Sequence, residues 1–333
     1  MATARNALLQ IEAGQSFTDF TALTDSGDHK NFGSPASQFS KADGKEPVIR
    51  PNGLATGGAI TPNSAADKID VAALTCYLAG AKISVAAESG VDLTRATTDG
   101  YSIVNSVTVN ASGEIAIVAG TEGAVLNPTG TRGGAGAAPW IPTGSIEIGQ
   151  VHLDDDDAAV VKDSEIKAVI GTHVERYDYP VFRADHSQGE VNFSAALPAI
   201  HSDDAGSTTA AKKVYASFYE PEFMDIPETS DFKPPEETHS QNSTQIYGGT
   251  IGASSSTLGQ GTFTAYLDDG LSDAIINLKN DTLWFRYYPN RMVTDKYLLC
   301  QGRFGISREF PADSGIRAAC TISAESPAVE VTP

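Results

Sequence analysis

The chain has 333 residues, of which 41% are hydrophobic and 20% charged, and its formal net charge is −19. The length allows two modest domains or one body with a large insertion, while 31 Gly and 17 Pro favour short strands and turns over long helices. The charge excludes general affinity for nucleic acid, because phosphate binding depends on Lys and Arg. No apolar run is long enough to cross a bilayer, so no membrane span is expected.

Residues 1–62 are rich in Gly, Ser, Thr, Asp and Pro, with a dense cluster of turn formers at 53–64. This composition predicts an extended N-terminal arm, which either orders against neighbouring subunits or stays a floppy terminus. The first residues lack the apolar core of a secretory signal, so we expect the protein to begin in a cytoplasm.

Residues 63–140 consist of short apolar runs separated by Gly, Asp or Ser, which predicts an additional β-rich domain. The run at 69–80 fits a strand or a helix, and we favour strand. Residues 127–144 are almost wholly Gly, Pro, Ala and Thr, a composition that predicts a linker at the end of this domain.

Residues 141–333 are expected to form the main body. Strands are predicted at 145–153, 189–200, 212–223, 262–269, 282–288 and on both sides of the turn at 311–315. Leu271, Ala274, Ile275 and Leu278 fall at helical spacing behind Ser272, which predicts one short helix. Residues 221–249 are too polar and Pro-rich for a central strand and predict a long projecting loop. The fold class is therefore mainly β, an antiparallel sandwich or barrel-like body with one short flanking helix.

Motifs that carry chemistry are weak in this chain. Cys76, Cys300 and Cys320 cannot all pair and form no C-x-x-C motif, which favours buried free thiols. The acidic run at 154–165 resembles a calcium loop, but Ala159 replaces the required Gly. The six histidines are scattered, with no pair at i, i+4. We therefore expect no catalytic residues, no metal, no cofactor and no enzyme, and a structural or binding role.

The order of elements in the C-terminal part resembles the closing part of a major tail tube protein from a long-tailed, siphovirus-type bacteriophage. The resemblance covers 189–325 and is carried by the strand, short helix and strands from 259 to 325, and by a last strand pair with Gly302, Ile306, Ser307, Asp313, Ile316 and Ser323.

The resemblance implies a virion structural protein that self-assembles into rings, commonly hexameric, which stack as a helical assembly into a tail tube. DNA would pass through the tube during ejection without specific binding. The partners would be copies of the chain, other tail proteins and head–tail connector proteins. Assembly would take place in the host cytoplasm, and the mature protein would reside in the virion tail.

Two groups of residues follow as candidates. A bore that lets DNA slide should be acidic, and Glu190, Asp268 and Asp269 are predicted to line it. The apolar residues within 221–249 are unusual in a solvated loop, and they are predicted to contact a neighbouring subunit: Phe223, Met224, Ile226, Phe232 and Ile246.

Two alternatives remain at this stage. A viral decoration or receptor-binding β module shares the Gly-, Thr- and Asn-rich strands. An enzyme that degrades polysaccharide would need two carboxylates brought together across a cleft by the fold.

Overall fold

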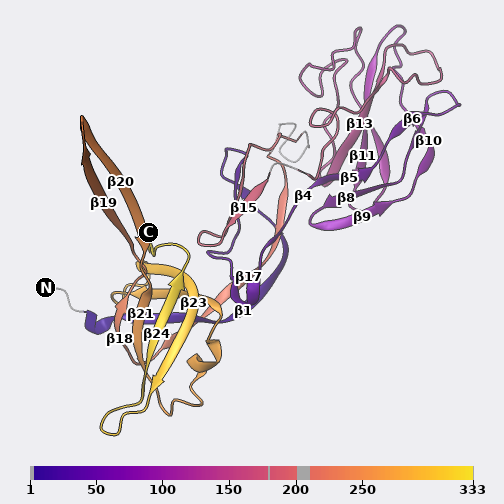
Figure 1. Cartoon of the computed structure of the whole chain (residues 1–333). Helices are drawn as coiled ribbons and strands as arrows, with labels where there is room; N and C mark the ends of the chain where they lie inside the picture. Colours follow the sequence, from indigo (N-terminus) through magenta and orange to yellow (C-terminus); the bar gives the residue numbers. More distant parts are fainter. Residues whose placement is uncertain (1–3, 179–180, 201–210, 333) are drawn as a thin grey trace. The chain divides into compact units, whose positions relative to one another are not determined.

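A computed structural model describes residues 4–178, 181–200 and 211–332, and it is mainly β with several antiparallel sheets (Figure 1). The predicted mainly β, antiparallel architecture is confirmed. The chain divides into two compact units. Unit 1 is Met1–Phe17, Ser37–Glu46 and Phe218–Pro333, and unit 2 is Thr18–Ala36 and Pro47–Ser217.

Unit 1 is built on one sheet with the strand order β18-β21-β24-β23-β22-β1-β17, and β25 pairs with β23. The strands of this unit are β1 (Leu8–Ala22), β17 (Val214–Ile226), β18 (Thr229–Lys233), β19 (Glu237–Ile246), β20 (Gly249–Leu258), β21 (Gly261–Tyr266), β22 (Thr282–Tyr288), β23 (Tyr297–Glu309), β24 (Arg317–Ala324) and β25 (Val329–Val331). Three 3-10 turns accompany them: η1 (Ala4–Asn6), η2 (Ala42–Gly44) and η4 (Ala274–Leu278). Parts of β1 and β17 belong to unit 2.

The core of unit 1 follows from alternation along its strands. Phe263 and Ala265 of β21 are buried while the alternating Thr262 and Thr264 are not, as period-2 geometry requires of a half-buried strand. Phe263 stacks on Phe304 of β23, with ring centroids 6.2 Å apart. Cys300 and Cys320 lie in the same core as free thiols, and burial raises the pKa of each to about 12. The predicted buried free thiols are confirmed.

A buried carboxylate fastens the segment 37–46 to the sheet of unit 1. The Glu12 side chain is fully buried, and its Oε2 accepts a hydrogen bond from the backbone N of Trp284 at 3.0 Å. Its Oε1 accepts from Ser40 Oγ. The indole N–H of Trp284 in turn donates to the Phe39 carbonyl at 2.8 Å. These bonds satisfy polar groups that burial would otherwise leave unpaired.

Unit 2 contains four small sheets, with the orders β10-β7-β6, β5-β8-β9, β12-β11-β13-β14 and β15-β16-β3-β2. Their strands are β2 (Thr24–Asp25), β3 (Asn31–Gly33), β4 (Val48–Pro51), β5 (Gly53–Gly57), β6 (Ile60–Pro62), β7 (Lys68–Val71), β8 (Leu74–Leu78), β9 (Ala81–Val85), β10 (Glu88–Asp92), β11 (Ile103–Asn110), β12 (Ile115–Ala119), β13 (Ser145–Leu153), β14 (Ile166–Lys167), β15 (Phe182–Asp185) and β16 (Glu190–Phe193). Strand β4 pairs with the beginning of β17.

Strands β11 and β13 form the centre of unit 2. Apolar side chains such as Val107 and Val151 enter a core shared with β6 to β10. The register shifts between Val107 and Thr108, so that β13 carries one extra residue there. On the opposite side of these strands lie polar side chains that are nevertheless buried: Ser106, Thr108, Glu147, Gln150 and His152. Unit 2 therefore encloses an apolar core and a separate buried polar cluster.

The predicted N-terminal arm is wrong. Residues 1–62 contribute strands β1 to β6, and Leu9 and Ile11 of β1 are buried in the core of unit 1. Leu9 is opposite Tyr287 and Ile11 is opposite Phe285 in β22. The turn-forming residues in this region separate short strands, so their density reflects many connections between strands.

The predicted division at 63–140 and 141–333 also needs correction. Strand β13 pairs along its length with β11, so residues 145–153 belong to the same sheet as 103–110. The predicted linker at 127–144 is part of unit 2, where Gly136 to Pro139 and Ile141 are buried. Small residues are needed here because a Cβ on Gly136 would lie 2.2 Å from the Val125 carbonyl oxygen. The strand at 69–80 is confirmed, as β7 and β8.

The predicted loop at 221–249 is made of strands: the end of β17, then β18 and β19. Pro234 and Pro235 fall in the short connection between β18 and β19, where no ladder hydrogen bond is lost. The polar sequence that suggested a loop belongs to β19, which pairs only with β20.

The predicted short helix is not confirmed. Residues 274–278 form only the 3-10 turn η4, in which Ile275 is the one buried residue. Asp273, which precedes η4, uses its carboxylate to bind the backbone N of Asp268 and of Gly270, and makes no cap bond to the turn. With Asn280 in the left-handed region at φ 76°, the segment is too short to recover the cost of helix nucleation.

Replacing Glu12 tests whether its buried carboxyl group stabilises the contact between the segment 37–46 and the sheet of unit 1. Burial raises the pKa of Glu12 above its ordinary 4.5, although bonds from Ser40 and Trp284 oppose the shift. The stability that this group contributes is therefore present below about pH 4.5 and lost as the pH rises through the raised pKa. Glu12→Gln, which keeps the shape and stays neutral, should gain stability relative to the native chain as pH rises from about 4 to about 8.

The measurement is urea unfolding followed by Trp284 fluorescence in a Trp140→Phe background. Glu12→Ala is the control, because it orphans two donors and should lose about 1–3 kcal/mol at every pH. A stability difference between Glu12→Gln and the native chain that does not change with pH would contradict the raised pKa.

Candidate functional site

A hollow in unit 1 lies where β17 and β21 end, and we call it the end cavity. Its volume is about 300 Å³. Its lining consists of Met224, Asp225, Ile226, Pro227, Ala265, Tyr266, Leu267, Asp268, Ser272, Asp273, Ala274 and Ile275. The apolar members form the wall and the carboxylates lie among them, an arrangement suited to an apolar group that carries a hydrogen-bond donor.

Two carboxylates shape the turn beside the end cavity. Asp273 accepts hydrogen bonds from the backbone N of Asp268 at 2.9 Å and of Gly270 at 2.8 Å. Asp269 accepts from the Ser272 hydroxyl at 2.6 Å and from the backbone N of Leu271 and of Ser272. These bonds, the Ser272 hydroxyl first, lower the pKa of Asp269 to about 2. Asp269 therefore stays ionised at any physiological pH.

Exposed apolar side chains surround this turn. Leu271 is 73% exposed and Phe310 is 57% exposed. The two loops that carry them are joined by a bond from the Leu267 backbone N to the Ile316 carbonyl and by one from Arg308 to the Gly270 carbonyl. Gly270 has φ 68°, and a Cβ there would lie 2.7 Å from the Phe310 ring, so the close approach requires glycine. This end of unit 1 thus combines apolar surface with fixed acidic groups.

Strands β19 and β20 form a hairpin that leaves the sheet of unit 1 (Figure 1). Ten residue pairs hold it together, from Glu237 opposite Leu258 to Ile246 opposite Gly249. Among the described residues, no other strand pairs with either of its arms. The two-residue turn at its tip holds Gly248 at φ 95° and leaves Tyr247 fully exposed. Both outer edges of the hairpin therefore present unpaired backbone groups.

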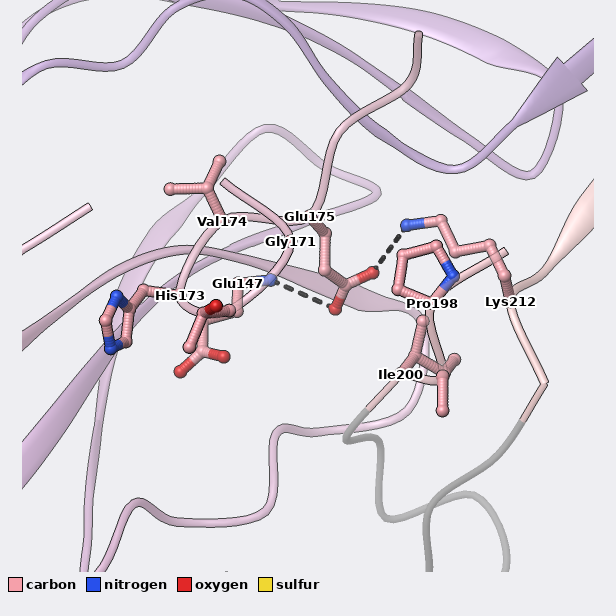
Figure 2. A pocket seen from close by; sticks show the side chains of 10 residues that line it. Glu147, Gly171, His173, Val174, Glu175, Pro198, Ile200 and Lys212 are labelled. Atoms are coloured by element: carbon pink, nitrogen blue, oxygen red, sulfur yellow. Dashed lines mark hydrogen bonds and ion pairs between the residues drawn. The ribbon is translucent and has the colours of Figure 1, made fainter. Parts of the chain in front are cut away.

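A second, much smaller cavity of about 20 Å³ lies in unit 2, beside the buried polar cluster (Figure 2). Figure 2 shows Lys212 and Glu175 pointing toward each other, and Lys212 Nζ lies 2.9 Å from Glu175 Oε2. Oε1 of Glu175 accepts from the backbone N of Glu147 at 3.4 Å. The cavity has space for about one water molecule, and the polar side chains of the cluster beside it are buried.

Glu147 is the centre of that cluster. Its carboxylate accepts from Ser106 Oγ at 2.5 Å and from Gln150 Nε2 at 2.9 Å, and it pairs with the Arg132 guanidinium. Burial raises the pKa of Glu147, and the charge of Arg132 opposes that shift. Burial also lowers the pKa of His152 to about 4, so this imidazole is neutral near pH 7. The Gly-rich segment that carries Arg132 acts as the cover of this cluster.

The structure brings together three of the residues predicted from the sequence. Met224 and Ile226, predicted as contacts, and Asp268, predicted for the channel, all line the end cavity. Asp269 is exposed next to it. Glu190 belongs to unit 2, where it is half-buried in β16 opposite Gly33 of β3. Whether any of these acidic residues lines a channel stays a prediction.

The reason given for the predicted contacts is wrong for most of them. Phe223 lies against the Arg286 guanidinium at 3.8 Å, and Phe232 stacks on Tyr287 with ring centroids 4.6 Å apart. Ile226 is buried in the core of unit 1. These residues are apolar because they pack within the chain. The side chain of Ile246 lies outside the described residues.

Sequence reasoning missed three parts of the candidate surface. Tyr247 and Phe310 stand next to turn residues, and Leu271 was assigned to the apolar face of the predicted helix. Isolated exposed apolar residues are common on protein surfaces, so the sequence offers no signal that separates these three from others. Only the turn geometry shows that Leu271 and Phe310 are neighbours.

No family model matches the chain, and a search of curated proteins finds none similar to it. Within the described ranges, no helix has the length and apolar character needed to span a membrane. No group of three metal-ligating side chains was found among the residues that the structure describes.

The buried pair of Arg132 and Glu147 should matter far more than an exposed pair. The Arg132 side chain is 9% exposed and that of Glu147 is 2% exposed. Arg132→Met leaves a buried carboxylate unpaired, and we expect a loss of about 3–5 kcal/mol in the free energy of unfolding of unit 2. Unfolding in urea, followed by Trp140 fluorescence in a Trp284→Phe background, measures this loss.

The matched control is Arg176→Met, which breaks the pair with Asp178 at the surface and should cost about 0–1 kcal/mol. Adding Glu147→Gln to Arg132→Met should restore part of the loss, because the unpaired charge is then removed. Equal losses for the two arginine variants would show that burial does not amplify the Arg132 pair.

Proposed function

We propose that this chain is a structural subunit that assembles with copies of itself into a tube, as in the tail of a long-tailed bacteriophage. The observation that carries the proposal is the hairpin β19–β20, which leaves the sheet of unit 1 and pairs with no other described strand. The resemblance in the C-terminal part supplies the kind of assembly, namely stacked and commonly hexameric rings through which DNA leaves the virion.

The hairpin supports self-assembly because it is poorly stabilised by its own chain. An isolated two-stranded hairpin is marginally stable in water, and unpaired edges attract other strands. Natural edge strands are usually protected by Lys, Pro or bulges. None of these occurs within 237–258, and the pairing is regular along all ten pairs. Contact with a neighbouring subunit would stabilise the hairpin and cover its edges.

The charge distribution supports the same role. Copies of a chain with a net charge of −19 repel one another, so a contact element should be nearly neutral. The 22 residues from Glu237 to Leu258 include one Glu, one His and no Asp, Lys or Arg. The hairpin is therefore a nearly neutral projection that suits contact with another copy.

Acidity also suits a conduit for DNA. Fixed carboxylates repel phosphate and give sliding DNA no place to stop. Asp269, with its pKa lowered to about 2, keeps its charge under all physiological conditions. We propose Glu190, Asp268 and Asp269 as lining of the bore, and head–tail connector and other tail proteins as further partners.

Removing the hairpin tests the proposal. Replacing 238–257 by Asn-Gly joins Glu237 and Leu258 through a tight turn, since these two residues are already opposite each other. The shortened chain should fold, with a melting temperature close to that of the full chain, and should form no tubes. Negative-stain microscopy and sedimentation of both proteins at matched concentration measure the difference.

Ser240→Thr with Ser255→Thr is the control, because it keeps the length and the polar pairing of these two residues. This variant should assemble as the full chain does. Tubes formed by the shortened chain would overturn the role of the hairpin. A full chain that stays monomeric or trimeric would instead favour a decoration or receptor-binding module.

Salt provides an independent test of the charge argument. Raising the ionic strength from about 0.01 M to about 0.15 M shortens the Debye length from about 30 Å to about 8 Å. Screening should weaken repulsion between acidic copies, so the protein concentration at which tubes appear should fall severalfold. A matched series of a non-ionic solute is the control. Tubes that dissolve in salt would show that charge pairs, not a neutral contact, hold the copies together.

A further inference from the structure

The hairpin and the end cavity lie at opposite ends of the same strand. Strand β21 begins at Gly261, shortly after the hairpin, and ends at Tyr266, which lines the end cavity. Its neighbour β18 is antiparallel, with Thr229 opposite Ala265 near the end cavity and Lys233 opposite Thr262 near the hairpin. Six residues of strand span about 20 Å. Unit 1 therefore has a projection at one end and a hollow at the other.

The side chains that line the end cavity determine which chemical group can bind in it. Its wall is formed by Met224, Ile226 and Leu267, and its polar side chains are Asp225, Tyr266, Asp268, Ser272 and Asp273. Among the lining residues there is no Lys, Arg or His. A carboxylate would be repelled here, whereas an apolar group with a single hydroxyl donor matches both the wall and the acceptors.

The tip of the hairpin carries such a group. Tyr247 is fully exposed, and its phenol combines an apolar ring with one O–H donor. The residues on either side of the two-residue tip are uncharged, so the tip approaches the acidic rim without repulsion between like charges. Ten-residue arms reach about 33 Å, which carries the tip beyond the body of unit 1. Exposed tyrosines of this kind often anchor protein interfaces.

We propose that Tyr247 of one copy inserts into the end cavity of the next copy, so that each chain both gives and receives one hairpin. This inference rests on the proposed function and names the two surfaces that join. A contact between different surfaces on each copy is heterologous, and where the rotation between copies does not close a ring it repeats along an axis. In that case it extends a filament, as the stacking of rings requires.

Cysteine cross-linking tests this contact. Cys76, Cys300 and Cys320 are all buried, so added surface cysteines report with little background. Ala274 is exposed and lines the end cavity, which makes it the acceptor position. A full chain with Tyr247→Cys and Ala274→Cys should give a ladder of covalent multimers on a non-reducing gel when it is oxidised well above tenfold the concentration at which the native chain assembles, which offsets the loss of the Tyr247 ring. Each single variant should give monomer.

If another segment occupied the end cavity, a different pair of cysteines would form the cross-link. Met292 is exposed in the 289–296 loop and belongs to the same unit. A ladder from Met292→Cys with Ala274→Cys, but none from Tyr247→Cys with Ala274→Cys, would assign the cavity to that loop and overturn the inference. A covalent dimer from Tyr247→Cys alone would indicate a symmetric contact between hairpins and also overturn it.

A second measurement uses no added cysteine. Tyr247→Ala should raise the concentration needed for tube formation at least tenfold, as expected for an anchoring aromatic residue. Tyr247→Phe keeps the ring and should raise it less than threefold. Normal assembly by Tyr247→Ala while the full chain forms tubes would overturn this inference and leave the proposed function standing. Failure of the unmodified chain to form tubes at all would overturn both.

Discussion

The hairpin β19–β20 extends from unit 1 without pairing to any other described strand, and the assembly proposed for this protein depends on it. Backbone donors and acceptors on both outer edges of β19–β20 have no strand partner within the described chain. Water satisfies such groups, but two strands in water bury too little apolar surface to be stable alone. Under the proposed function, contact with another copy stabilises the hairpin, and its near neutrality in a chain with a net charge of −19 limits repulsion at that contact.

The two units use buried carboxylates in the same way. In unit 1, Glu12 ties the segment 37–46 to the sheet, and in unit 2, Glu147 ties the segment with Arg132 to β13. In both places burial raises the pKa of the carboxyl group and hydrogen bonds hold it down. A carboxylate that is bound from several segments specifies one arrangement of those segments, because removing any donor leaves a buried polar group unsatisfied.

The sequence allowed the strands to be predicted better than their organisation. Alternation at Phe263 and Ala265 predicts β21, and alternating apolar residues likewise predict β11 and β13, because period-2 burial is a local property. Pairing of β13 with β11 across the Gly-rich segment is not local, and the composition of that segment suggested a linker. Gly136 allows the close approach to Val125, and Arg132 of the same segment pairs with Glu147 of β13. Neither contact can be read from the composition of the segment.

The candidate site shows the same limit. Met224 and Asp268 were predicted for different roles, and they meet because β17 and β21 end at the same place. The helical spacing of Leu271 and Ile275 suggested a helix, but Asp273 binds the backbone that precedes it and Asp269 the backbone that follows it, and both hold the chain in a turn. Polar side chains of this kind compete with helical hydrogen bonds over short segments. Periodicity alone does not show whether the helical or the side-chain hydrogen bonds form.

The marginal stability of the hairpin has a further consequence under the proposed function. Ordering ten residue pairs on contact costs conformational entropy, so a single contact between two free copies is weak. The end of a growing tube presents several binding surfaces that are already ordered. Each added subunit then makes several contacts but loses its translational freedom only once. Free subunits therefore stay apart at low concentration, and growth proceeds at the end of an existing assembly. The negative charge that keeps free copies soluble also raises the barrier to nucleation of new tubes. A high nucleation barrier favours a few long tubes over many short ones.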